Sequence, residues 1–158
     1  MTESAHPDQP YLQIGEAAER TGLTQRTLRY YEEKGLLKPP SRMDGGFRLY
    51  SPEDIERLAR IKELKELLGF SLADIKEMVE ADDVRLQVRT QWRQDAEDSE
   101  KVARIRVARE VTLTQLRLVD EKLEKMATLR DELVARLAKY DGWLVQYASQ
   151  QQSEEART

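Results

Sequence analysis

The stretch GLTQRTLRYYEEKGLL, residues 22–37, determines how the fold of this chain begins. Thr24 suits a helix N-cap, because its hydroxyl can accept a hydrogen bond from a free backbone N–H of the first turn. Leu23 and Leu28 can then pack against each other across the cap. Gly35 can adopt the left-handed conformation that ends a helix. The stretch therefore predicts a short helix that begins after Thr24 and stops just before Gly35.

A second short helix is predicted immediately before this one. Ile14, Ala17 and Ala18 follow the i, i+3, i+4 spacing of one helical face. Gly22 can end that helix in a tight turn. Two short helices joined in this way form a helix-turn-helix.

The two sides of the helix after Thr24 differ in chemistry. Leu28 and Tyr31 point to one side, toward the preceding helix. The other side carries Gln25, Arg26, Arg29 and Tyr30. Arg can bind guanine and Gln can bind adenine through paired hydrogen bonds, and Arg and Tyr also hold phosphates. We expect this side to contact DNA, and the alternative is an ordinary solvated helix face.

The distribution of charge favours the DNA interpretation. The whole chain has a net charge of −4. Between Arg20 and Tyr50, however, seven basic residues stand against three acidic ones, which gives a local charge of +4. Such a segment can turn one face of an acidic protein toward phosphate.

Composition excludes several other kinds of site. The chain has 158 residues, no cysteine and one histidine, His6, in a polar N-terminal stretch. Disulfides, thiolate metal sites and cysteine catalysis are therefore excluded, and no nucleophile–base pair or phosphate loop is evident. No apolar run is long enough to span a membrane, and no signal peptide is evident. We expect a cytoplasmic protein that is not an enzyme and has no cofactor.

A small hairpin, or wing, is predicted after the helix-turn-helix. Residues 36–38 and 47–50 are short extended candidates, separated by Pro39-Pro40 and Gly45-Gly46. Arg42 is expected in the loop. Alternation along the second strand places Arg48 and Tyr50 on one side, and Phe47 and Leu49 on the other. This wing would add basic groups beside the recognition helix, and an ordinary polar hairpin is the alternative.

Two more helices are predicted from their caps. Ser51 and Pro52 begin a helix that Gly69 ends, and Ser71 caps the next one. Lys62 and Lys65 on the first of these helices can reach phosphates. Exposed helical lysines are usually not specific, so these are weaker candidates.

A long heptad pattern occupies the last third of the chain. It has apolar residues at positions a and d, which is typical of a coiled coil, and one polar interruption, Arg130. A helix of this length cannot bury its stripe within so small a chain, so a two-fold homodimer is the simplest solution and an intramolecular bundle is the alternative. The predicted dimerisation residues are Leu116, Val119, Leu123, Met126, Arg130, Leu133, Leu137, Tyr140 and Leu144.

The runs IGEAAERTGLTQRTLRYYEEKGLL and GGFRLYSPEDIERLARIKELKELLGFSLADI resemble the MerR family of bacterial transcription regulators. The resemblance covers about half of the chain and implies a mainly α fold. It consists of an N-terminal winged helix-turn-helix DNA-binding domain followed by a long dimerisation helix that pairs as an antiparallel coiled coil. The expected segments are a disordered arm (1–10), the DNA-binding domain (11–81), a linking helix and break (82–100), the coiled-coil helix (101–149) and a disordered tail (150–158).

The resemblance also implies a function. Family activators bind a pseudo-palindromic operator in an overlong promoter spacer, and they bend and untwist it so that RNA polymerase can engage both promoter elements. Carried over to this chain, the DNA contacts are Thr24, Gln25, Arg26, Arg29, Tyr30, Arg42, Arg48, Tyr50, Lys62 and Lys65. The alternatives are an architectural DNA-bending protein without an effector, and a helical protein-interaction module.

Effector binding is the least determined part of this hypothesis. Metal and redox sensors of the family use cysteines, which are absent here, and multidrug sensors carry a large C-terminal domain. A small apolar pocket beside the coil is one hypothesis, and packing in the dimer core is the alternative. The aromatic residues that would form this pocket are Trp92, Tyr140, Trp143 and Tyr147.

Overall fold

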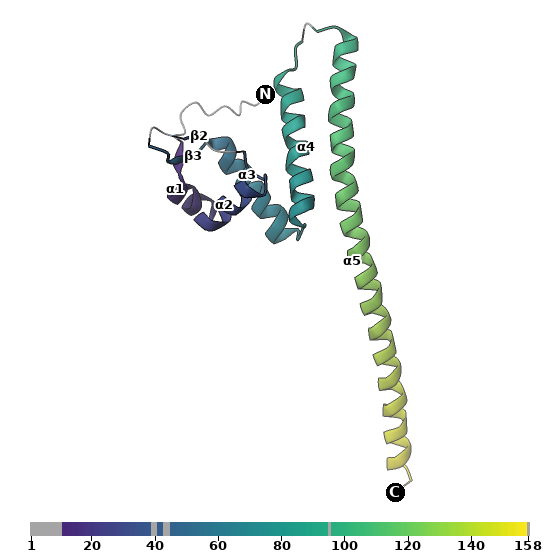
Figure 1. Ribbon diagram of the computed structural model, residues 1–158. Helices are drawn as coiled ribbons and strands as arrows, with labels where there is room; N and C mark the ends of the chain where they lie inside the picture. Colours follow the sequence, from purple (N-terminus) through teal and green to yellow (C-terminus); the bar gives the residue numbers. More distant parts are fainter. Residues whose placement is uncertain (1–10, 39–40, 43–44, 95, 158) are drawn as a thin grey trace. The chain divides into compact units, whose positions relative to one another are not determined.

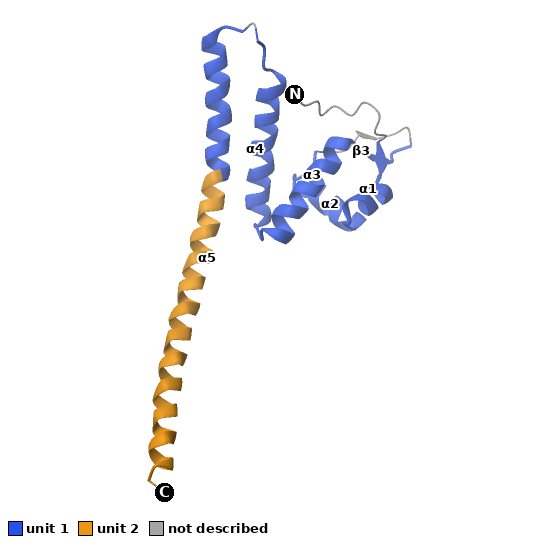
Figure 2. Cartoon of the chain, turned by 180° about the vertical axis from the view of Figure 1, so that it is seen from behind, with its two compact units in different colours: residues 1–115 blue, residues 116–158 orange. Residues whose placement is uncertain are grey.

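The protein is described here by a computed structural model that covers residues 11–38, 41–42, 45–94 and 96–157. The chain divides into two units, the first ending at Gln115 and the second beginning at Leu116 (Figure 2). The predicted N-terminal arm, residues 1–10, lies outside the described residues. None of the helices in the described part combines the length and apolarity that crossing a bilayer requires.

The helix-turn-helix is confirmed. Helix α1 (Ile14–Thr21) ends at Gly22, whose φ of 67° is left-handed, and α2 (Gln25–Glu33) follows. The Thr24 hydroxyl accepts a hydrogen bond from the Thr27 N–H at 3.1 Å, as expected of an N-cap. These local caps explain why the two helices begin and end where the sequence indicates.

The wing belongs to a three-stranded antiparallel sheet in the order β1-β3-β2. Its strands are β1 (Leu12–Gln13), β2 (Ser41–Arg42) and β3 (Arg48–Tyr50). Leu12 pairs with Tyr50, and Arg42 pairs with Arg48. Strand β1 was not predicted, and Arg42 lies in a strand instead of the expected loop.

The predicted strand at residues 36–38 is wrong. The backbone N–H groups of Leu36 and Leu37 donate to the Tyr31 carbonyl, at 2.9 and 3.3 Å. They close the end of α2 after Gly35, which has a φ of 72°. These two N–H groups are therefore unavailable to a sheet, and both leucine side chains are buried in the core instead.

Three further helical segments complete the first unit, together with the beginning of α5 (Figure 1). They are α3 (Pro52–Lys62), a π-helical turn η1 (Glu63–Leu67) and α4 (Leu72–Thr90). The side chains of Ser51 and Ser71 cap α3 and α4, as predicted. The core of this unit contains Leu28, Leu58, Ile61, Leu64 and Ile75, all of which are buried.

The long helix is longer than predicted. Helix α5 (Asp98–Glu155) has 58 residues, so residues 150–155 continue the helix instead of forming a disordered tail. This segment has the sequence QQQSEE and contains no Gly or Pro to stop a helix. The expected linking helix is also not separate, because residues 82–90 belong to α4.

Candidate nucleic-acid interface

Helix α2 presents two different sides, as predicted. Leu28 and Tyr31 are buried in the core of the first unit. The opposite side is exposed and consists of Thr24, Gln25, Arg26, Arg29 and Tyr30. We call these five residues the recognition face.

The guanidinium groups of the recognition face have no carboxylate partner among the described residues. Within the described part of the chain, neither Arg26 nor Arg29 forms an ion pair with a carboxylate. Two exposed arginines one helical turn apart can therefore bind an external anion or a base edge without first breaking an internal contact.

The aromatic ring of Tyr30 is held from two sides. Its centroid lies 6.2 Å from that of Tyr31, and the Lys34 ammonium lies 5.6 Å from the Tyr30 centroid. Tyr31 is fully buried, so it provides a fixed support for its neighbour. Tyr30 remains partly exposed at the edge of the recognition face.

Glu32 connects this helix to the wing. The Arg48 Nε atom lies 2.9 Å from one Glu32 carboxylate oxygen, and the Tyr50 hydroxyl donates a hydrogen bond to the other. Burial, followed by the hydrogen bond to Glu32, raises the pKa of Tyr50 well above its usual value. One carboxylate thus holds strand β3 against α2.

Sequence reasoning missed this role of Glu32 and counted the residue only as a negative charge. The signal was its position four residues after Leu28, which places it at the margin of the buried side of α2. A carboxylate at such a position needs a partner, and Arg48 and Tyr50 provide it.

The predicted contact between Tyr50 and DNA is not supported, because Tyr50 is only 1% exposed. Arg48 and Tyr50 share one side of β3, as predicted, but Tyr50 on that side is buried and not turned to solvent. Strand β3 lies in the middle of the sheet and packs against α1 and α3, so Tyr50 faces the core. Arg48 retains about one-third of its side-chain exposure while pairing with Glu32. The side chain of Arg42 lies outside what the structure describes.

The two predicted lysine contacts differ in their surroundings. The Lys62 ammonium donates to the Thr21 carbonyl at 3.1 Å and so holds the end of α1. This bond gives Lys62 a structural role that the sequence did not reveal. Lys65 is exposed, and its ammonium lies 5.9 Å from the Tyr31 ring centroid.

The heptad residues of the second unit form an exposed apolar stripe. Nine apolar a and d residues between Leu116 and Tyr147 have exposed fractions of 37% to 69%. Arg130 interrupts this stripe, and its Nη1 atom lies 3.4 Å from the Oδ1 atom of Asp131. We call the a and d residues from Leu116 to Tyr147 the seam.

The predicted aromatic pocket is only partly represented. The rings of Tyr140 and Trp143 lie 5.7 Å apart, and the Lys139 ammonium is 4.9 Å from the Trp143 centroid. Tyr147 lies two helical turns after Tyr140 in the same unit, whereas Trp92 belongs to the first unit. In the part of the chain that is described, no cluster of three or more His, Asp or Glu side chains is arranged to hold a metal ion.

Comparison with known proteins relates this geometry to a family of regulators. The family described as MerR HTH family regulatory protein matches residues 12–82. The HTH-type transcriptional regulator YfmP of Bacillus subtilis is 35% identical over 123 residues, which cover 78% of this chain and 88% of that protein.

Two solved structures are similar over most of the chain. HiNmlR, a MerR family regulator lacking the sensor domain and bound to promoter DNA, is 26% identical with a TM-score of 0.50. The match covers 84% of this chain and 91% of that one. A putative MerR family transcriptional regulator from Listeria monocytogenes is 21% identical with a TM-score of 0.55, covering 92% and 98%, and supports the fold alone.

Proposed function

The chain belongs to the MerR family of helix-turn-helix regulatory proteins, and on this premise we propose that it is a homodimeric, sequence-specific transcription regulator that binds a pseudo-palindromic promoter operator. The observation that carries the proposal is the recognition face of α2. It combines an amide, a supported phenol and two guanidinium groups, all exposed on one capped helix. Neither guanidinium group forms an ion pair with any residue that the structure describes.

In this proposal, α2 enters the major groove. Arg26, Arg29 and Gln25 are the groups that contact base edges, because their donors match the acceptors that guanine and adenine present there. Thr24 and Tyr30 contact the backbone. The wing adds Arg48 and Arg42 for neighbouring phosphates, and Lys65 remains a candidate for the same task.

The seam supports self-association. A monomer would leave a stripe of apolar residues in water along about 48 Å of helix, at 1.5 Å per residue over residues 116–147. A second copy pairing antiparallel covers that stripe and creates a two-fold axis. A two-fold protein then matches a two-fold operator.

The regulatory step in this proposal is deformation of the promoter. HiNmlR was solved on promoter DNA, and we extend that kind of target to this chain. The dimer would bend and untwist the spacer between the promoter elements, so that RNA polymerase in the cytoplasm can engage both. No catalytic step and no cofactor belong to the proposal.

The test is replacement of one recognition-face arginine. Arg29→Ala should weaken specific DNA binding by about 1–3 kcal/mol, because one bidentate base contact is lost. Non-specific binding should fall only slightly and the fold should be unchanged. Affinities would be measured by fluorescence anisotropy at several salt concentrations, because phosphate contacts are strongly salt-dependent.

Arg157→Ala is the matched control, since it removes the same charge from an exposed site far along the chain from α2. Equal specific affinity for wild type and Arg29→Ala protein would show that α2 does not read the operator. Binding that is insensitive to salt would favour the protein-interaction module instead.

A further inference from the structure

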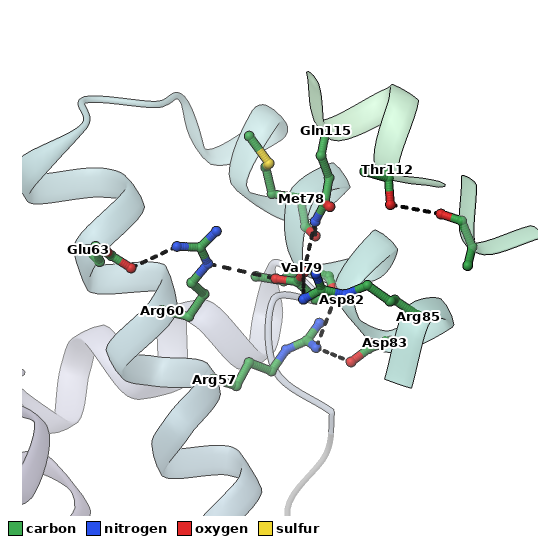
Figure 3. Close-up of polar contacts among 11 residues, drawn as sticks. Arg57, Arg60, Glu63, Met78, Val79, Asp82, Asp83, Arg85, Thr112 and Gln115 are labelled. Carbon is green, nitrogen blue, oxygen red and sulfur yellow. Dashed lines mark hydrogen bonds and ion pairs between the residues drawn. The ribbon is translucent and has the colours of Figure 1, made fainter. Parts of the chain in front are cut away.

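A chain of polar contacts begins where the recognition helix ends. Arg57 on α3 donates from Nε to the carbonyl of Leu36, which lies in the turn that closes α2, at 2.5 Å. The same side chain donates from Nη1 to the Asp83 carboxylate at 2.5 Å and to the Val79 carbonyl at 3.5 Å, both on α4 (Figure 3). The Arg57 side chain is largely buried and Asp83 is partly exposed, so these bonds are only partly shielded from water. Arg57 therefore links the exit of α2 to α4.

The neighbouring residue on α4 continues the chain to α5. One oxygen of Asp82 accepts a hydrogen bond from Gln115 Nε2 at 2.8 Å and another from Arg85 at 3.1 Å. The other oxygen lies 3.7 Å from Arg60 Nε on α3. Gln115 also donates to the Met78 carbonyl at 3.0 Å. Asp82 thus contacts side chains from three helices.

The position of Gln115 gives this contact its importance. It is the residue immediately before Leu116, the first residue of the seam, and α5 is one continuous helix through both. The two hydrogen bonds from Gln115 thus join α5 to α4 at the point where the seam begins.

We propose that the Asp82–Gln115 contact is a positioning element that sets the half-site spacing of the operator. The inference rests on the proposed function. In a two-fold dimer, the seam fixes the centre and α2 reads each half-site, so the link between them determines how far apart the half-sites lie. A rigid link admits one spacing, and a loosened link admits several.

Selection from a library of randomised DNA duplexes tests the proposal with the full-length chain. Wild-type protein should enrich paired half-sites at one spacing. Gln115→Ala should enrich the same half-sites at several spacings. The preference for the wild-type spacing over one changed by a base pair should fall about fivefold or more, the range of typical coupling between sites. Affinity for a single half-site should stay within about twofold, because Gln115 does not lie on the recognition face.

Two matched variants separate positioning from general destabilisation. Gln115→Lys keeps a donor of similar reach for Asp82 and should keep the single spacing. Thr112→Ala, one turn earlier on α5, removes only a hydrogen bond to Ala108 within the same helix and should also keep it. Asp82→Ala removes the acceptor from the α4 side and should broaden the spacing as Gln115→Ala does, even if one of the two variants folds poorly.

The outcomes distinguish the two proposals. Paired half-sites at one spacing for wild type and also for both alanine variants at positions 82 and 115 would overturn the positioning role while leaving the proposed function intact. Enrichment of no paired half-sites by wild type would overturn the proposed function itself. Broadened spacing by the control Thr112→Ala would likewise reject a specific role for the Asp82–Gln115 contact.

Discussion

Leucine side chains that are buried in the first unit of the chain contrast with leucine side chains that are exposed in the second. In the first unit, Leu28 and Leu58 are completely buried by the chain's own helices. In the second, Leu123 and Leu137 are more than half exposed. Burial of a leucine contributes about 1.5–3 kcal/mol, so a helix that leaves a whole row in water lacks its main source of stability. The first unit therefore buries a core of its own, whereas the seam of the second unit stays exposed within the described chain.

This difference separates two tasks. The unit that buries its own core can hold the recognition face rigid, because Tyr31 and Glu32 fix α2 from inside. In the proposed homodimer, the exposed seam of the other unit is the interface for a second copy.

The largest effect is expected from a charge in the seam. Leu123→Lys would place an ammonium group at a site that the dimer buries, which is costly when the charge has no partner. The variant should be monomeric by sedimentation at concentrations where wild type is dimeric, and its operator binding should lose two-fold cooperativity. A stable dimer would place the interface elsewhere.

Cysteine cross-linking tests whether the two seams pair antiparallel, and it is feasible because the chain contains no cysteine of its own. Full overlap of two antiparallel seams places Leu116 opposite the partner's Tyr147, and Met126 opposite the partner's Leu137. The variant with both Met126→Cys and Leu137→Cys should form cross-linked dimers under mild oxidation. These positions are 11 residues apart on one helix, about 16 Å, which is too far for a bridge within the chain.

Each single variant provides the control for this experiment. Met126→Cys alone should not cross-link, since the two copies of this residue would be about 16 Å apart in the antiparallel arrangement. Efficient cross-linking of that single variant would instead indicate parallel helices.

The next effect concerns the self-contained core. Leu58→Ala should lower the free energy of unfolding by about 2–5 kcal/mol, because a fully buried side chain leaves a cavity. Denaturant titration, followed by a spectroscopic signal from the first unit, would measure this loss of unfolding free energy. This loss should be nearly independent of protein concentration, because the core lies within one chain. The stability difference between wild type and Leu123→Lys should instead depend on concentration, because it arises from dimerisation. A loss below about 1 kcal/mol would mean that the core can collapse around the cavity.

The smallest effect is expected at the contact between the wing and α2. Tyr50→Phe removes the hydrogen bond to Glu32 and should cost about 1 kcal/mol at neutral pH. Because folding raises the pKa of Tyr50, the folded wild type retains the phenolic proton to higher pH than the unfolded chain does. The stability that this proton contributes is constant below a pH of about 10 and is lost as the pH rises further.

The pH dependence provides the check on that assignment. Unfolding would be followed in denaturant at pH 8 and at pH 10.5 for both proteins. Wild type should lose more stability than Tyr50→Phe between these two values. Parallel losses would show that Tyr50 does not ionise differently in the two states.

Local signals in the sequence predicted the helix-turn-helix and the capped helices well. Thr24, Gly22, Ser51 and Ser71 act on backbone groups within a few residues, so their effect is readable without knowledge of the rest of the fold. The heptad pattern similarly predicted an exposed seam, since periodicity is a property of one helix.

What the sequence did not determine depends on contacts between distant segments. Alternation showed that Arg48 and Tyr50 share a side of β3, but not that β1 and the helices would cover Tyr50. Glu32 and Lys62 likewise have partners 16 to 41 residues away along the chain. The end of α5 was missed for a different reason, since a polar segment without Gly or Pro is compatible with either helix or coil.

The most direct test of the account is a nuclease footprint of the purified protein on the DNA upstream of its own gene, with the transcription start mapped on the same fragment. We predict two equally protected half-sites between the promoter elements, hypersensitive cleavage between them, and weaker protection by Arg29→Ala at equal concentration. A footprint of one unpaired half-site, or protection that Arg29→Ala reproduces fully, would contradict a dimer that reads its operator through α2.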